Sequence, residues 1–471
     1  MPDEQGAAEA KERVASNPYL RDAGTIREPP TGFGNTLKFL GPGLILAGSV
    51  VGSGEIILTT TLGATVGFVM LWWLLLSCWG KSFVQAELAR YTVSSGETVL
   101  RAFNRLPGKL PGPKGRVSWF IWVWLLTIIP NNLLGGGGIY GGVGQAVHMG
   151  LPFLDSRWWT VIFAALASAL ILTGTYRLLE KVMAFMVCTF TLVTLVCAFS
   201  LQFTPFAITW PDVQAGLLFE FPAFAIAAAL ASYGATGVTA GESMIYTYWC
   251  VEKGYARFTG PVDKSPDWVR RARGWIRVMQ TDVVLTLVVL TCATIPFYML
   301  GAGVLHRMEA TPGGLETIST LSNMYTQTLG AWAADLFMIG AFFVLFSTVV
   351  SALGGEARMI ADCMGVLGVI DSQNYRSRLR VLRFWAVFSP LVMSLCYYFV
   401  ENPVWMLTIS GTTAAMLSPI VAAGTIYLRY KHTDRRIAPT WKADFLLWLS
   451  FIVMLGLASY TVYFIFQGYV L

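Results

Sequence analysis

The stretch GPGLILAGSVVGSGEIILTTTLG at residues 41–63 interrupts the first apolar segment of the chain. The interruption consists of Gly52, Ser53, Gly54 and Glu55. Glycine weakens a helix, and a carboxylate at membrane depth costs roughly 2.5–3.5 kcal/mol on insertion scales. Because of these costs, we expect such residues inside an apolar segment only where the protein needs a helix break and polar groups. The pattern therefore predicts a broken membrane helix with a binding site at the break.

A second stretch far downstream repeats the pattern of a small residue, a glycine and a glutamate. It is YGATGVTAGESMIY at residues 233–246, where Ala240, Gly241, Glu242 and Ser243 again interrupt an apolar segment. Two interrupted helices at corresponding positions are the sequence pointer to an inverted-repeat carrier with its site near the bilayer midplane. We therefore predict that the two stretches form one substrate site.

The composition indicates an integral membrane protein. Of the 471 residues, 55% are hydrophobic and only 13% are charged, against roughly 25% charged residues in soluble domains. The net charge of +6 does not indicate a nucleic-acid partner, because Lys and Arg are gathered in alternate loops as in membrane proteins. The seven cysteines have no metal or disulfide spacing, and no catalytic or nucleotide-binding constellation is present. We predict neither a cofactor nor an enzymatic activity.

Stretches of about 20 apolar residues, the length that crosses a bilayer, predict eleven membrane-spanning helices. They lie near residues 39–64, 67–91, 117–147, 157–175, 180–203, 217–250, 278–303, 331–363, 382–400, 403–429 and 443–469. The predicted fold class is an all-α integral membrane protein.

The basic residues predict the orientation of the chain. They crowd the N-terminal tail and every second loop, chiefly residues 90–116, 253–277, 376–383 and 429–442. Because Lys and Arg favour cytoplasmic loops, the N-terminus is predicted to be cytoplasmic and the C-terminus outside. We expect a monomer in the inner membrane of a bacterial-type cell, surrounded by lipid.

Four segments follow from this plan. Residues 1–37 are predicted to form a flexible cytoplasmic tail, 38–205 a first repeat of five helices, 206–430 a second repeat, and 431–471 an eleventh helix. An odd number of helices in each repeat makes the second run through the membrane in the opposite direction. The two breaks then occupy helices 1 and 6.

The residue types at the breaks predict a hard, oxygen-rich site. Two carboxylates, two serine hydroxyls and freed carbonyls suit Mg²⁺, Ca²⁺ or Mn²⁺ better than thiophilic metals. Each glutamate has an alternative role, which is to cap the N–H groups of the half-helix that follows it. The predicted substrate-binding residues are Gly52, Ser53, Glu55, Ala240, Gly241, Glu242 and Ser243, with Glu55 and Glu242 as the metal ligands.

Three motifs resemble a known family. GPGLILAG at 41–48, LGATVGFVMLWWLLLS at 62–77 and QAELARYTVSSGE at 85–97 are similar to the Nramp family of divalent-metal transporters, which have a LeuT-type inverted-repeat fold. The resemblance implies transport by alternating access, with the ion held between helices 1 and 6.

The chain departs from the family at the ligands. Where the family has Asp-Pro-Gly-Asn, residues 52–55 read Gly-Ser-Gly-Glu, so the Asp ligand is absent and Glu55 stands in the Asn position. Where the family has Ala-Met-Pro-His, residues 240–243 read Ala-Gly-Glu-Ser, so Gly241 replaces the soft Met and Ser243 replaces the His. Loss of a thioether disfavours soft metals and resembles the magnesium-transporting branch of Nramp relatives.

Other polar residues in the spans are predicted to gate or support the site. They are Asn131, Asn132, Thr412 and Glu356. The two asparagines lie near the third-helix positions where the resemblance implies acidic residues for proton exit. Because amides do not titrate, we expect transport without the family's ordinary proton coupling.

Two functions fit these residues. The first is a secondary transporter of a hard divalent cation, Mg²⁺ or Mn²⁺. The alternative is a carrier of a small organic solute, such as an amine or an amino acid, in which Glu55 pairs with an ammonium group and the glycines make room for the solute.

Overall fold

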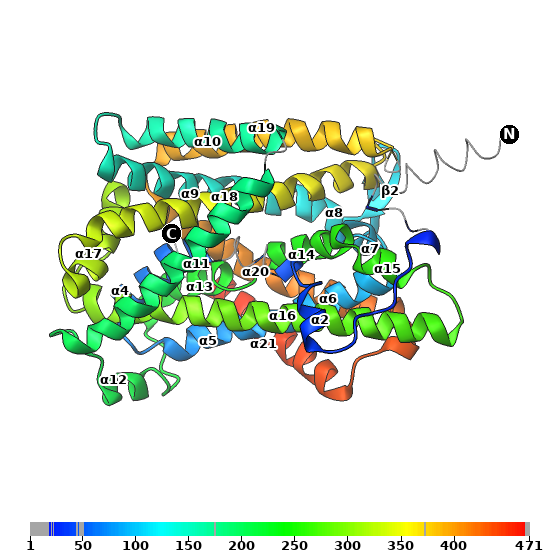
Figure 1. The fold of residues 1–471 in the computed structure, drawn as a ribbon, viewed down its shortest axis with the longest axis horizontal. Helices are drawn as coiled ribbons and strands as arrows, with labels where there is room; N and C mark the ends of the chain where they lie inside the picture. Colours follow the sequence, from blue (N-terminus) through cyan, green and yellow to red (C-terminus); the bar gives the residue numbers. More distant parts are fainter. Residues whose placement is uncertain are drawn as a thin grey trace.

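The computed structural model describes residues 18–466, apart from residues 20, 22, 44–45, 47–50, 174–175 and 372–373. For residues 176–184, 186 and 187 only the backbone is described. Most of the long helices run along the long axis of the molecule, and α11 (Tyr176–Ser200) crosses them obliquely (Figure 1).

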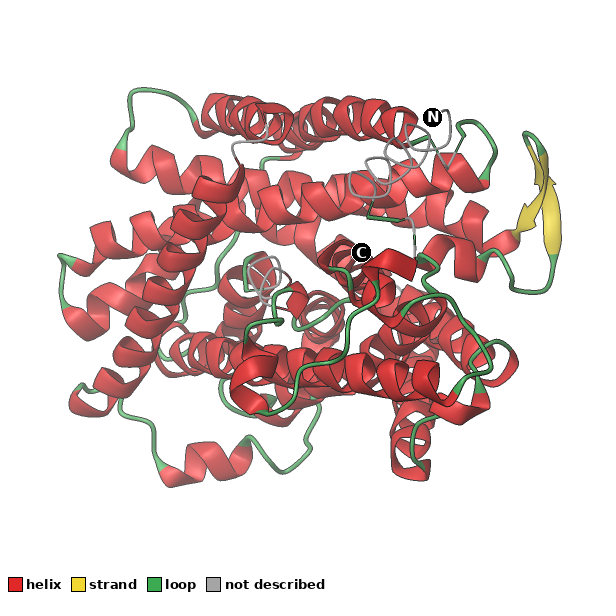
Figure 2. Cartoon of the chain, turned by 45° about the vertical axis from the view of Figure 1, so that its right-hand side comes forward, coloured by secondary structure: helices red, strands yellow, loops and turns green. Residues whose placement is uncertain are grey.

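The described part of the chain is almost entirely helical (Figure 2). Up to residue 215 the elements are η1 (Ala23–Thr25), α2 (Phe33–Leu37), η2 (Gly54–Thr59), α4 (Thr60–Val66), α5 (Leu71–Gly80), α6 (Ser82–Ser95), α7 (Val99–Phe103), β1 (Lys109–Gly112), β2 (Gly115–Ser118), α8 (Trp119–Val123), η3 (Trp124–Ile128), α9 (Ile129–Gly150), α10 (Ser156–Thr173), α11, η4 (Leu201–Phe203) and α12 (Trp210–Ala215). They continue with η5 (Ala223–Ala225), α13 (Ile226–Ala235), α14 (Ala240–Lys253), α15 (Tyr255–Thr259), α16 (Pro266–Leu300), η6 (Gly301–Leu305), η7 (Gly314–Glu316), α17 (Thr317–Leu329), α18 (Ala333–Val366), α19 (Tyr375–Val400), α20 (Pro403–Lys431), η8 (Arg435–Ile437) and α21 (Trp441–Phe466). The η elements are 3-10 turns except η2, η3 and η6, which are π-helical.

Eight helical segments of the described chain are long and apolar enough to cross a membrane. They are Trp119–Gly150, Ser156–Thr173, Ala223–Lys253, Pro266–Leu305, Ala333–Val366, Tyr375–Val400, Pro403–Lys431 and Trp441–Phe466. Each coincides with one of the eleven predicted spans, which confirms the all-α membrane class. The predicted first span includes residues outside the described set, the fifth lies within α11 and η4, and the second divides at Lys81 into α5 and α6. The count of eleven stays a prediction.

One small sheet was not predicted from the sequence. Strands β1 and β2 pair in an antiparallel hairpin within the basic loop at 90–116, with Lys109 opposite Ser118. The tight turn between them ends at Gly115, whose φ of +138° favours glycine. In the sequence, the run Gly112, Pro113, Lys114 and Gly115 is typical of a tight turn and could have indicated the hairpin.

Close backbone contact sets the position of α13, the first half of the second broken helix. It packs against α20 where two glycines face each other. A Cβ on Gly234 would lie 1.7 Å from the carbonyl oxygen of Gly411, and one on Gly411 would lie 2.3 Å from that of Ala231. Because no larger side chain fits there, the glycine pair lets the two backbones touch.

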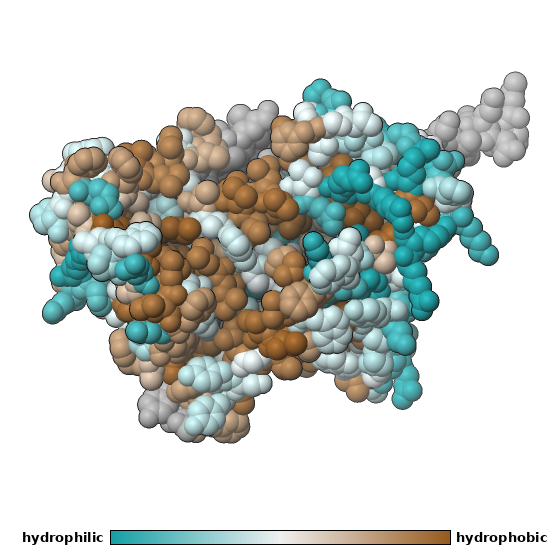
Figure 3. All heavy atoms as spheres, turned by 90° about the horizontal axis from the view of Figure 1, so that it is seen from below, coloured by the Kyte–Doolittle hydropathy of each residue, from teal (hydrophilic) through white to brown (hydrophobic). Residues whose placement is uncertain are grey.

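The basic loops gather at one end of the molecule. Buried Asp362 of α18 accepts hydrogen bonds from Arg101, Arg378 and Thr98, which brings α7 and the start of α19 together. Figure 3 shows the same division on the surface, with hydrophilic residues gathered at one end and a broad hydrophobic area beside them. The basic loops, which alternate with less basic loops along the sequence, therefore lie together at one end of the bundle.

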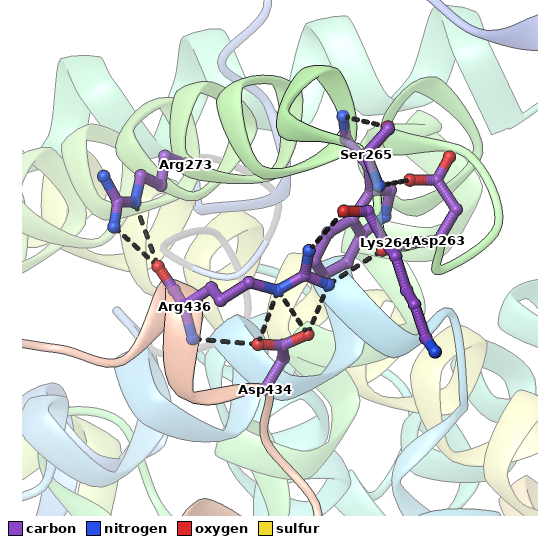
Figure 4. A network of polar contacts seen from close by, with 7 residues as sticks. Asp263, Lys264, Ser265, Arg273, Asp434 and Arg436 are labelled. Atoms are coloured by element: carbon purple, nitrogen blue, oxygen red, sulfur yellow. Dashed lines mark hydrogen bonds and ion pairs between the residues drawn. The ribbon is translucent and has the colours of Figure 1, made fainter.

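A second network at this end joins η8 to the start of α16 (Figure 4). Arg436 bonds to Asp434 at 2.8 Å and donates to the carbonyls of Asp263 and Lys264. Arg273 donates in turn to the carbonyl of Arg436 at 2.6 Å. The hydrogen bonds from Arg436 lower the pKa of the Asp434 carboxyl from its ordinary value, so this pair stays ionised at neutral pH.

The described part of the predicted flexible tail is packed against the bundle. The Tyr19 hydroxyl donates to Glu252 at 2.9 Å. The indole of Trp275 donates to the carbonyl of Arg27, also at 2.9 Å, and the N–H of Arg27 donates to Phe258. These contacts hold this part of the segment in place, and residues 1–17 lie outside the described residues.

Candidate functional site

The first break lies directly before the π-helical turn η2. The N–H of Ile56 donates to the carbonyl of Gly52 at 2.8 Å, so Gly52 already belongs to the turn. Gly54 lies directly against the second break, because a Cβ on it would lie 2.4 Å from the carbonyl oxygen of Ala235. The glycine at position 54 is therefore required for the two breaks to meet.

The second break separates α13 from α14. It turns at Gly237, whose φ is +67°. Thr239 then caps α14, since its hydroxyl accepts from the N–H of Glu242 at 3.1 Å and the Glu242 carboxylate accepts from the N–H of Thr239 at 2.8 Å. This is a capping box, which satisfies two N–H groups reciprocally. Glu242 thus has the capping role that the sequence left open.

Glu55 is fully buried and bonds to both breaks. Its Oε2 accepts from the N–H of Gly52 at 3.1 Å, and its Oε1 accepts from the N–H of Gly237 at 3.3 Å and from the Thr294 hydroxyl at 3.4 Å. Its 0% exposure and these three donors make it a polar bridge between the two breaks. The three donors come from the two breaks and from α16, so Glu55 links these elements.

A cavity of about 170 Å³ lies where the breaks meet α9, α18 and α20. Seven of the predicted site residues line it: Ser53, Asn131, Asn132, Ala240, Gly241, Glu242 and Glu356. The structure thus brings together the predicted second break and most of the predicted supporting residues.

The other four predicted residues do not belong to the described cavity lining. Gly52 packs against Thr348, and Glu55 lies behind the breaks. Ser243 lies beside Lys81 in a gap of about 10 Å³. The hydroxyl of Thr412 is buried on α20 with no hydrogen-bond partner among the described residues.

Glu356 is a buried carboxylate whose partners are all neutral. It accepts from the Asn132 amide at 3.2 Å, from the Trp385 indole at 3.1 Å and from the Ser389 hydroxyl at 3.4 Å. The neighbouring Arg358 pairs with Glu252 at 2.7 Å. Three neutral donors therefore hold the Glu356 carboxyl group at the cavity wall.

Three hydroxyl residues on the cavity wall were missing from the predicted site. Ser410 and Asn131 form two hydrogen bonds with each other. The Asn131 side-chain amide donates to the Ser410 backbone carbonyl at 3.2 Å, and the Ser410 hydroxyl donates to the Asn131 backbone carbonyl at 3.3 Å. Thr239 and Thr348 also line the cavity. The spacing of Thr239 and Glu242 was a capping-box signal in the sequence, whereas nothing local marked Thr348.

The charge of the cavity favours a cation. Its described lining contains two carboxylates, Glu242 and Glu356, and no Lys, Arg or His. Within the described chain no three His, Cys, Asp or Glu side chains are close enough to hold one metal ion. Apolar residues form much of the remaining wall: Ile128, Ile139, Ile245, Val349, Leu353, Met393, Leu407 and Leu417.

Two broken helices that meet at a charged cavity inside a membrane bundle define a membrane transport protein. Comparison with known proteins gives the family. The model of the natural resistance-associated macrophage protein-like (Nramp) family matches residues 43–464. The chain therefore belongs to the Nramp family, whose members are membrane transporters and not enzymes, and it has the LeuT-like fold.

Individual relatives are distant. An uncharacterized protein of Pasteurella multocida is 25% identical over 91% of this chain and 92% of its own length. The divalent metal cation transporter MntH of Bacillus subtilis is 26% identical over 83% of this chain and 81% of its own. Among solved structures, a mutant of the manganese transporter of Eremococcus coleocola is similar with a TM-score of 0.64, at 15% identity, over 92% of this chain and 88% of its own.

Proposed function

We propose that the protein is a secondary transporter of a hard divalent cation, Mg²⁺ or Mn²⁺, that works by alternating access. The observation that carries the proposal is that Glu242 and Glu356 line the same cavity, with no basic side chain in the described lining. The names of two relatives, a divalent metal cation transporter and a manganese transporter, support the substrate class.

The cavity suits an ion that keeps part of its water. Its volume of about 170 Å³ leaves room for several water molecules beside an ion. The two carboxylates supply charge but too few ligands for a dry cage, and Mg²⁺ in particular retains several waters in protein sites. The ion would therefore bind Glu242 and Glu356 directly or through water, with Ser53 and Asn131 completing the polar wall.

The same geometry changes the role proposed for Glu55. The sequence predicted it as a metal ligand, but its absence from the described cavity lining and its hydrogen bonds to both breaks support a structural role. We propose Glu242 as the acidic residue at the breaks that contacts the ion.

Transport without the family's ordinary proton coupling remains part of the proposal. Asn131 and Asn132 use their amides to bond Ser410 and Glu356. The described histidines lie away from the cavity lining: His148 and His306, for example, bond to carbonyls at helix ends. Among the described lining residues, Glu242 and Glu356 are the ones whose side chains can carry a proton.

The apolar walls favour the alternative substrate, a small organic amine. Ile245, Leu353 and Met393 offer contacts that a hydrated ion does not use. In this case Glu242 would bind the ammonium group and the apolar wall would hold the carbon chain.

The test is uptake into liposomes that contain the purified protein and a pH-sensitive dye. Mg²⁺ and Mn²⁺ are supplied separately, and Glu242→Gln is compared with the wild type and with Glu316→Gln, an exposed carboxylate outside the described cavity lining. We expect saturable entry of at least one ion that Glu242→Gln reduces about tenfold or more and Glu316→Gln leaves unchanged. The internal pH is expected to stay constant during uptake.

Two results would contradict this proposal. If neither ion enters while the folded protein is present in the membrane, the organic-amine alternative is favoured, and competition with short alkylamines tests it. Internal acidification that follows uptake would contradict the lack of proton coupling.

A further inference from the structure

Lys81 is a buried cation at the second break. It lies between α5 and α6 with only 2% of its surface exposed. Among the described residues no Asp or Glu lies within ion-pair distance of its ammonium group. A buried ammonium without a carboxylate partner needs other acceptors.

The acceptors are the backbone carbonyls that the break releases at the end of α13. Lys81 Nζ donates to the carbonyl oxygens of Tyr233 and Thr236. The Ser77 hydroxyl lies 3.1 and 3.2 Å from the same two oxygens. The ammonium group also lies 4.9 Å from the centroid of the Tyr233 ring. The C-terminal end of a helix carries partial negative charge, so it attracts a cation.

One peptide group connects the Lys81 amine to the buried Glu55 carboxyl group of the first break. The peptide between Thr236 and Gly237 offers its carbonyl to Lys81, and its N–H donates to Glu55 at 3.3 Å. The Lys81 side chain and the Glu55 carboxyl group thus bind the two ends of the same peptide group. The arrangement places Lys81 on the central polar contact between helices 1 and 6.

We propose that Lys81 is a tethered cation that permanently occupies a monovalent-cation site built from the broken end of α13. The two carbonyls and the Ser77 hydroxyl form an oxygen-donor set that suits Na⁺ or a small ammonium ion. The gap left beside Lys81 has about 10 Å³, barely the space of one water molecule. The native chain therefore has no room for an external cation here and needs no monovalent coupling ion at this site.

The test removes the tether and offers free cations in its place. The full chain is purified as wild type, Lys81→Ala and Lys442→Ala, the last being an exposed lysine on α21. Melting temperatures are measured at equal ionic strength in choline, Na⁺, K⁺ or ethylammonium chloride, choline being too large for the site.

We expect the same melting temperature for the wild type in all four salts. Lys81→Ala should melt about 5 °C lower in choline, because two carbonyls and the facing charge lose their partner. Na⁺ or ethylammonium should restore at least half of that loss, in a saturable way, and should leave Lys442→Ala unchanged. Two outcomes overturn the proposal: an unchanged melting temperature for Lys81→Ala in choline, or no cation that restores it selectively.

A second variant and a wild-type measurement cover the case in which Lys81→Ala does not fold. Lys81→Gln keeps a hydrogen-bond donor without the charge, so it should melt below the wild type in every salt. A Lys81→Gln protein as stable as the wild type would show that the charge is not needed, and a saturable rise of the wild-type melting temperature with Na⁺ or K⁺ would show that the site is open. Neither measurement depends on the transported substrate.

Discussion

The two glutamates of the helix breaks have the same local sequence pattern and different surroundings. Glu55 is fully buried and accepts hydrogen bonds from Gly52, Gly237 and Thr294. Glu242 is half-buried, lines the cavity and, among the described residues, bonds within its own capping box with Thr239. This difference underlies our proposal that Glu55 holds the two breaks together and that Glu242 contacts the substrate.

The largest effect is expected where the two breaks touch. Gly54→Ala places a Cβ 2.4 Å from the Ala235 carbonyl, a backbone atom that cannot move aside alone. We expect a loss of about 3 kcal/mol, the upper end of ordinary overpacking costs, with little folded protein recovered. Thermal melting and gel filtration check this, and a wild-type melting temperature would show that the breaks do not meet as described.

Glu55→Gln is expected to have the next largest effect on stability. Its amide would direct an N–H group at a backbone N–H that now donates to the carboxylate, which costs about 2 kcal/mol. The melting temperature should fall, while the half-saturation concentration for the ion should stay near that of the wild type. A stable protein with a strongly raised half-saturation would instead make Glu55 a ligand and remove the contrast with Glu242.

Glu242→Gln is expected to have the opposite effects, with a small change in stability and a large loss of cation uptake. Glutamine also serves in a capping box with Thr239, so the free energy of unfolding should change by less than about 1 kcal/mol. Uptake of the cation should fall about tenfold or more, equivalent to about 1.4 kcal/mol of lost binding. Melting and uptake are measured on the same preparation, because a fall in both would mean that Glu242 is mainly a cap.

Gly241→Ala is the smallest expected change and the control for Gly54→Ala. The nearest atom to an added Cβ is the Thr239 hydroxyl at 3.8 Å, which is ordinary contact. Alanine favours a helix over glycine by up to about 1 kcal/mol, so the melting temperature should stay level or rise. A fall as large as that of Gly54→Ala would show that both glycines are required for packing.

The sequence was sufficient for the class of fold, and it predicted where the helix breaks lie. Apolar length and alternating basic loops predicted the membrane bundle, and eight predicted spans recur as helices. The repeated small-Gly-Glu pattern predicted both breaks, because glycine and a carboxylate inside an apolar segment destabilise a membrane helix and are expected only where the helix is interrupted. Charged residues inside spans, such as Glu356, were also visible from composition alone.

Only the tertiary structure separated the roles of the residues at the breaks. An unwound segment has no periodicity, so the sequence could not say which of Ser53 and Glu55 faces the cavity. It also could not place Lys81 on the carbonyls of Tyr233 and Thr236, which lie about 150 residues away. These assignments depend on which helix packs against which, and long-range packing is a property of the whole bundle and not of any local stretch of sequence.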